Sequence, residues 1–179
     1  MYDGADLPFA ENVRRTRDVV AAAHARGAAA EAELGQVGHA SHDHLPVDLT
    51  DPEEARRFAR ETDVDALAVA IGTVHGMTET GAVLDIARIA DLARHVDAAL
   101  VMHGSSGVSD DMLARAVEAG IRKVNLSTAL QRVFMDTLRR SASVPGHETD
   151  ARAVLGDARD AVMEAARHRI RLVGATGRA

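Results

Sequence analysis

The chain has 179 residues, of which 46% are hydrophobic, so it is long enough to bury the core of one domain. Its formal net charge of −6 argues against a nucleic acid or an anionic membrane surface as a partner. The absence of cysteine excludes a disulfide framework and a thiolate metal site. Because the start is acidic and no apolar run approaches a membrane span, we expect a cytoplasmic protein.

Apolar periodicity, capping residues and glycines predict helices and strands that alternate along the chain. The strand candidates are short apolar runs, and most helix candidates open on a capping residue or an early proline. In chain order the predicted elements are a helix over 10–26, a strand within 28–35, a helix over 50–61, a strand over 65–71, a helix over 86–96, a strand over 98–102, a helix over 109–120, a strand over 123–126, a helix that begins at Ser127 or Thr128, and a helix over 150–173.

Strands that are apolar on both faces and separated by helices are typical of an all-parallel sheet covered by helices, so the predicted fold class is α/β. Polar residues are expected at the C-terminal strand ends, each one βα unit from the next. In a (β/α)8 barrel such residues face one active-site mouth, whereas a doubly wound sheet leaves some of them apart. The spacing favours a partial barrel with an all-parallel sheet. The residues in question are Asp3, Glu31, His75, His103 and Asn125.

Two of the apolar runs end in His-Gly, at His75-Gly76 and at His103-Gly104. Neutral imidazole is the commonest nitrogen ligand of zinc, and two such histidines with a carboxylate are enough to hold one ion. The alternative is that each histidine has a hydrogen-bonded structural role. Both interpretations stay open at this point.

The run Gly104-Ser105-Ser106-Gly107 offers backbone amides and hydroxyls to an oxyanion. The helix that begins at Ser127 or Thr128 is expected to bring its N-terminus beside this run. The alternative is that these glycines and serines simply cap helices. A separate tract, His39, His42 and His44, fits either a metal site or a polar loop.

Five motifs follow one another in a fixed order: Glu31-Ala-Glu-Leu-Gly35, Asp51-Pro-Glu-Glu-Ala55, Ala68-Val-Ala-Ile-Gly-Thr-Val-His75-Gly76, Met102-His103-Gly-Ser-Ser-Gly107 and Arg122-Lys-Val-Asn125. They resemble the class II, zinc-dependent ketose-bisphosphate aldolases. Tyr2-Asp3-Gly4 is similar to the fourth-strand motif of that family, and the resemblance extends over the whole chain.

The resemblance implies that His75 and His103 are two of the three histidines that hold a catalytic Zn²⁺. It implies that Asp3 and Glu31 are acidic positions associated with the binding of a second divalent cation. The zinc is expected to polarise the ketone in the reversible aldol cleavage of a ketose 1,6-bisphosphate to dihydroxyacetone phosphate and an aldehyde. The positions implied to contact dihydroxyacetone phosphate are Gly76, Gly104, Ser105, Ser106, Asn125, Ser127 and Thr128.

By the same resemblance, the first three βα units of the family have no counterpart before Met1. They would carry the proton-transferring Asp and the first zinc histidine, so no catalytic residue is assigned. We therefore expect a single domain over 1–179 that matches strands 4 to 8 of the barrel. It is expected to be a poor aldolase alone and to act as a homo-oligomer or with a complementing N-terminal segment.

Two alternatives remain open. One is a non-catalytic remnant that binds phosphosugars, and it predicts phosphate affinity that is independent of zinc and survives the loss of both histidines. The other is a truncated gene product. Within the aldolase interpretation, the sequence does not distinguish a fructose from a tagatose bisphosphate as substrate.

Overall fold

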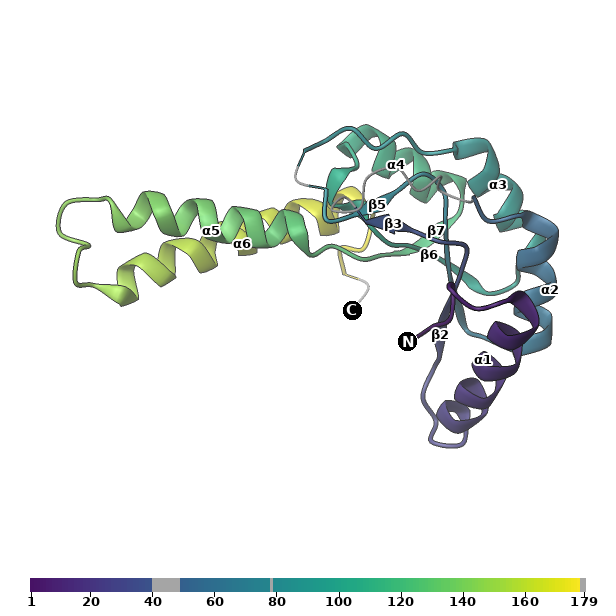
Figure 1. The fold of residues 1–179 in the computed structure, drawn as a ribbon. Coiled ribbons are helices and arrows are strands. Elements are labelled where there is room, and N and C mark those ends of the chain that lie inside the picture. Colours follow the sequence, from purple (N-terminus) through teal and green to yellow (C-terminus); the bar gives the residue numbers. More distant parts are fainter. Residues whose placement is uncertain (40–48, 78, 178–179) are drawn as a thin grey trace. The chain divides into compact units, whose positions relative to one another are not determined.

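The structure is a computed structural model that describes residues 1–39, 49–77 and 79–177. The chain divides into two compact units, Met1–Asn125 and Leu126–Ala179. The first unit contains parallel sheet and helices, and the second is a pair of helices (Figure 1). Within the described ranges, no helix is long and apolar enough to cross a membrane.

Helices and strands alternate through the first unit, close to the predicted positions. Its elements are β1 (Tyr2–Asp3), α1 (Phe9–His24), β2 (Glu31–Leu34), β3 (Gly38–His39), α2 (Pro52–Thr62), β4 (Ala66–Val69), β5 (Val74–His75), α3 (Ile86–His95), β6 (Ala99–Met102), the short 3-10 helix η1 (Ser105–Gly107), α4 (Asp110–Ala119) and β7 (Ile121–Val124). The second unit consists of α5 (Thr128–Ala142) and α6 (Ala151–Leu172), which pack against each other.

The main sheet has five strands in the order β1-β2-β4-β6-β7, and every neighbouring pair is parallel. The strand order therefore follows the chain without a reversal. A doubly wound sheet reverses direction at a switch point, whereas a barrel adds its strands in sequence order. The α/β class and the partial-barrel arrangement predicted from the sequence are confirmed.

Side-chain caps begin three of the helices in this unit; Asp85 and Ser109 stand where the sequence predicts helix starts, whereas the helix predicted from Thr50 is capped by Asp51. Asp51 accepts two backbone amides at the start of α2, and Asp85 and Ser109 each accept one at the starts of α3 and α4. Ser127 lies at the N-cap position of α5, but its side chain makes no capping bond and accepts instead from the amide of Gln131. The predicted start of α5 is therefore right, and the predicted capping bond is absent.

The core lies between the sheet and helices α1 to α4. Successive strand residues point to opposite faces, so every second residue of β2, β4 and β6 faces the helices. These residues and their helical partners are apolar and at most 7% exposed. They are Ala32, Leu34, Leu67, Val69, Leu100 and Met102 on the strands, and Val13, Phe58, Ile89, Leu92 and Leu113 on the helices.

A second, two-stranded parallel sheet joins β3 to β5 and pairs His39 with His75. The sequence predicts neither strand, since it places His75 at the end of one longer apolar strand. In the structure β4 ends at Val69, and the chain turns at Gly72 before β5 begins. Gly72 has φ +102°, and a Cβ there would lie 2.3 Å from the carbonyl oxygen of Val83. Only glycine fits this turn, which moves His75 onto a strand of its own.

Candidate metal centre

One row of residues crosses the main sheet from edge to edge. In register order it contains Asp3, Glu33, Ala68, Val101 and Lys123. Register partners project from the same face of a sheet, so Glu33 and Lys123 share the face opposite to the core. The small Ala68 stands between them on the central strand. It leaves room for long polar side chains from the outer strands to extend over β4.

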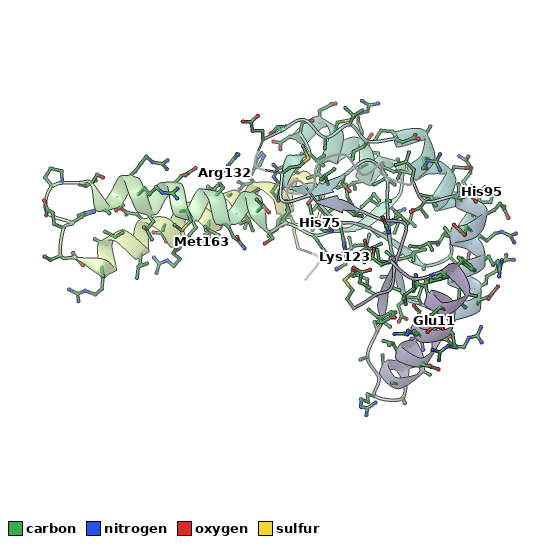
Figure 2. All side chains as sticks on the ribbon, viewed as in Figure 1. Glu11, His75, His95, Lys123, Arg132 and Met163 are labelled. Atoms are coloured by element: carbon green, nitrogen blue, oxygen red, sulfur yellow. The ribbon has the colours of Figure 1, made fainter. Side chains whose placement is uncertain are left out.

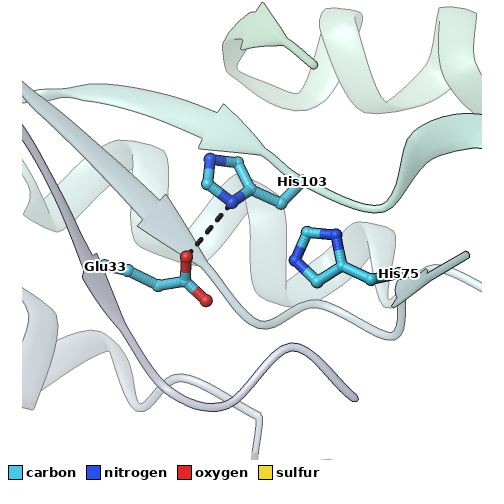
Figure 3. Close-up of side chains that lie close together, drawn as sticks. All are labelled: Glu33, His75 and His103. Carbon is cyan, nitrogen blue, oxygen red and sulfur yellow. Dashed lines mark ion pairs between the residues drawn. The ribbon is translucent and has the colours of Figure 1, made fainter. Parts of the chain in front are cut away.

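His103 joins this face because it follows Val101 by two residues, immediately after β6. Its side chain meets Glu33 and His75, and one ligand atom from each of the three lies within 4.8 Å of the others. His103 Nδ1 lies 3.1 Å from Glu33 Oε2 (Figure 3). The rings of His75 and His103 meet edge to face, with centroids 5.7 Å apart.

The donor set of this cluster suits zinc. Catalytic zinc sites use three protein ligands, among them two histidines with a glutamate, and keep one position open. Glu33 is 4% exposed and His103 is 5% exposed, which distinguishes them from the acidic groups that are common on protein surfaces. A carboxylate at such burial needs a cation or a donor beside it. Glu33, His75 and His103 therefore fit a single zinc ion.

His103 lies between the carboxylates of Glu31 and Glu33, the two acidic residues of β2. His103 Nε2 lies 2.9 Å from Glu31 Oε1, on the other side of the ring from Glu33. The hydrogen bond to Glu33 raises the pKa of His103; burial opposes this, and the bond to Glu31 adds to it. Burial alone would raise the pKa of Glu31, but hydrogen bonds from Lys123 and His103 hold it below its usual value.

The raised pKa of His103 predicts how the stability of the metal-free chain depends on pH. A histidine whose pKa is higher in the folded state stabilises the fold at pH values below its unfolded pKa, here 6.5. That contribution is lost as the pH rises through the pKa of the folded state. Urea unfolding in chelator, at about pH 6 and about pH 9, should therefore show the gap between wild type and His103→Ala shrinking at the higher pH. An equal gap at both values would contradict this charge state.

The predicted phosphate-binding residues of the first unit lie around the same strand ends. Gly76 follows β5, and Gly104 follows His103 with φ +62°. Ser105 is fully buried and its hydroxyl donates to the backbone carbonyl of Asn125. Ser105 therefore has its backbone N–H, rather than its hydroxyl hydrogen, to offer an anion. Ser106 is half-buried in η1.

Asn125 ends the first unit, where its backbone N–H donates to the carbonyl of Met102, 3.0 Å away. Its side-chain oxygen accepts a hydrogen bond from Lys123 Nζ at 2.8 Å. Ser127 and Thr128 belong to the second unit, at the start of α5.

Asp3 lies in register with Glu33, but its side chain is exposed and accepts the backbone amide of Ala5. The cluster of Glu33, His75 and His103 does not include it. His42 and His44 of the histidine tract lie outside the described residues, as does the side chain of His39.

Sequence reasoning missed two residues of this face, Glu33 and Lys123. The signal for Glu33 was present, because Glu31 and Glu33 alternate with Ala32 and Leu34 and so share one face of a strand. Treating this strand as apolar on both faces hid that pattern. Figure 2 shows His75 and Lys123 at the sheet, whereas Glu11 and His95 lie on the surrounding helices.

The chain is similar to a known family and to several solved structures. A family model described as fructose-bisphosphate aldolase class-II matches residues 1–178. The YdjI aldolase from Escherichia coli K12 is 34% identical with a TM-score of 0.83, and the match covers 100% of this chain and 62% of that one. A structure from Coccidioides immitis is 29% identical with a TM-score of 0.81, over 99% of this chain and 63% of that one.

A third structure, a fructose-bisphosphate aldolase from Campylobacter jejuni, shares the fold at 20% identity and a TM-score of 0.78. The match covers 96% of this chain and 59% of that one. Across the three structures the chain therefore spans about three fifths of the length of the proteins it matches.

Proposed function

The chain belongs to the class II fructose-bisphosphate aldolases, and we propose that it takes part in the zinc-dependent, reversible aldol cleavage of a ketose 1,6-bisphosphate. The observation that carries this proposal is the convergence of Glu33, His75 and His103 from three different strands or strand ends on one point. Bound there, zinc supplies a Lewis acid that polarises a ketone carbonyl. The products would be dihydroxyacetone phosphate and an aldehyde.

The residues of this chain would hold and orient the reacting molecule. Buried Glu33 and His103 are fixed by the sheet, whereas half-buried His75 reaches the same point from β5. The loop that follows His103 is proposed to lie next to the ketone of the bound molecule. Backbone amides in that loop, at Gly104 to Ser106, are proposed to hold the phosphate, together with Gly76 and Asn125. That Ser127 and Thr128 contact dihydroxyacetone phosphate stays a prediction of the family resemblance.

For the second divalent cation predicted at Asp3 and Glu31, the structure supplies no shared contact between the two side chains. Glu31 is engaged with His103 and Lys123, and Asp3 with a backbone amide. A metal at Asp3 would therefore need both side chains to change partners. We keep the single zinc ion as the proposed cofactor of the cluster.

We also propose that the sheet is completed by another segment of protein. In the described part of the chain, β1 and β7 each pair on one side only, and unpaired strand edges recruit further strands. The complementing N-terminal segment expected from the sequence is the proposed occupant, and a second copy is the alternative. Sedimentation of the purified chain separates these two occupants. A second copy predicts a dimer or larger species, and a chain that sediments as a monomer contradicts the second copy.

The binding of dihydroxyacetone phosphate tests the proposed function. Calorimetric titration of the zinc-loaded chain should give binding that is lost in chelator and in the double variant His75→Ala/His103→Ala. His95→Ala is the matched control, because His95 is on α3 and bonds to its own helix. Equal binding in chelator and in the double variant would overturn the proposal and support a phosphosugar-binding remnant instead.

A further inference from the structure

Glu31 touches His103 on the side that faces away from the zinc cluster. The imidazole of His103 directs Nδ1 to Glu33 and Nε2 to Glu31, at 3.1 and 2.9 Å. All three side chains are largely buried, with 6%, 5% and 11% of their surfaces exposed for His103, Glu33 and Glu31. The ring therefore has two different carboxylate neighbours, and only one of them belongs to the cluster.

The other oxygen of Glu31 is bound to Lys123. Lys123 Nζ donates to Glu31 Oε2 at 2.6 Å and to Asn125 Oδ1 at 2.8 Å. This ion pair joins β2 to β7 and extends over the two strands between them, where the Glu31 row contains only Ala66 and Ala99. Each oxygen of the Glu31 carboxylate thus has one partner, and both partners are cationic or hydrogen-donating groups.

A histidine binds a metal through one ring nitrogen only if that nitrogen carries a lone pair, and the hydrogen bond of the other nitrogen decides this. Nδ1 faces Glu33 and His75, so a metal in the cluster requires the hydrogen on Nε2. Glu31 is an acceptor at the position where that hydrogen would point. A carboxylate that is itself held by a lysine keeps its orientation.

Resting on the proposed function, we propose that Glu31 is a positioning residue for His103 and that Lys123 holds Glu31 in place. Glu31 accepts the Nε2–H of His103, which keeps the Nδ1 lone pair directed at the zinc position. Glu31 is then not a ligand of a second cation. Lys123 contributes indirectly, because its ammonium group fixes the rotation of the Glu31 carboxylate.

Zinc affinity in four variants tests this proposal. Competition with a chromophoric chelator should show that Glu31→Gln weakens zinc binding by about 10- to 100-fold. Lys123→Met should weaken it by a smaller factor, since the side chain is 49% exposed, and Lys123→Arg, which keeps a cation, should restore most of the affinity. Glu61→Gln is the matched control, because Glu61 pairs with Arg57 on the surface of α2.

A second readout follows His103 directly and does not depend on zinc. In ¹⁵N-edited NMR of the metal-free full chain, the Nε2–H of His103 should give a slowly exchanging, downfield signal that is lost in Glu31→Gln and kept in Glu61→Gln. Circular dichroism identifies variants that fail to fold. A His103 signal unchanged in folded Glu31→Gln would overturn the proposal, as would zinc affinity within about 2-fold of wild type.

The two readouts separate this inference from the proposed function. If wild type takes up no zinc but the His103 signal depends on Glu31, the zinc site is wrong and the positioning contact stands. If zinc binds through His75 and His103 regardless of Glu31, the proposed function stands and the positioning role is wrong.

Discussion

Replacing His103 with alanine should raise the dissociation constant for zinc by at least about 100-fold. Structural zinc sites with four ligands bind with roughly 10 to 16 kcal/mol, or about 3 kcal/mol for each ligand, and about 3 kcal/mol corresponds to roughly 100-fold. His103 contacts both acidic residues of β2, so its loss also leaves Glu31 and Glu33 without their shared donor. Competition titration with a chromophoric chelator measures the effect.

The same variant should lower the free energy of unfolding by about 3 kcal/mol, because removing one partner from a buried ionic group leaves charge uncompensated. Urea unfolding of the metal-free chain at about pH 6 measures this loss. His95→Ala serves as the control, since that histidine lies on α3 and contacts Asp91 of its own helix. Zinc binding within about 3-fold of wild type in His103→Ala would show that the cluster is not the metal site.

Replacing Gly104 with alanine should damage both the fold and the metal site. Gly104 has φ +62°, and a Cβ added there would lie 2.8 Å from the carbonyl carbon and oxygen of Val74. These are backbone atoms of β5, so the clash is relieved only if β5 moves. We expect the free energy of unfolding to fall by about 3 kcal/mol, from left-handed strain together with overpacking.

Movement of Val74 displaces His75, which is the next residue on β5. We therefore expect zinc affinity in Gly104→Ala to fall by about 10-fold or more, a loss comparable to that from disturbing the support of a metal ligand. Gly81→Ala is the matched control, because no atom lies within 4 Å of a Cβ at that position. If both glycine variants bound zinc equally well, the contact between the loop after β6 and β5 would not hold the site together.

The sequence predicted the layout of the fold because most of its signals were local. Asp51, Asp85 and Ser109 mark three helix starts through side-chain caps, and the apolar runs at 66–69 and 99–102 are buried strands in the structure. Each of these features depends on residues that are near each other in the chain. Strand order then followed from the repeated βα unit.

The candidate site was only partly predictable because it depends on register between distant strands. The structure brings His75 and His103 together, as their similar sequence context suggests, but it does so through β5 and a turn at Gly72. Whether Glu31 or Glu33 reaches the cluster is decided by the pairing of Glu33 with Ala68, which no local pattern reveals. Zinc ligation by the two histidines stays a prediction.

Glu33, His75 and His103 are proposed to hold one zinc ion. Zinc-edge X-ray absorption of the chain loaded with one equivalent tests it most directly, because imidazole rings give a distinct outer-shell signal. We predict a nitrogen and oxygen shell at about 2.0 to 2.2 Å with two imidazoles, one of which disappears in His75→Ala and one in His103→Ala. A shell whose imidazole count is the same in wild type and in both variants would contradict the claim.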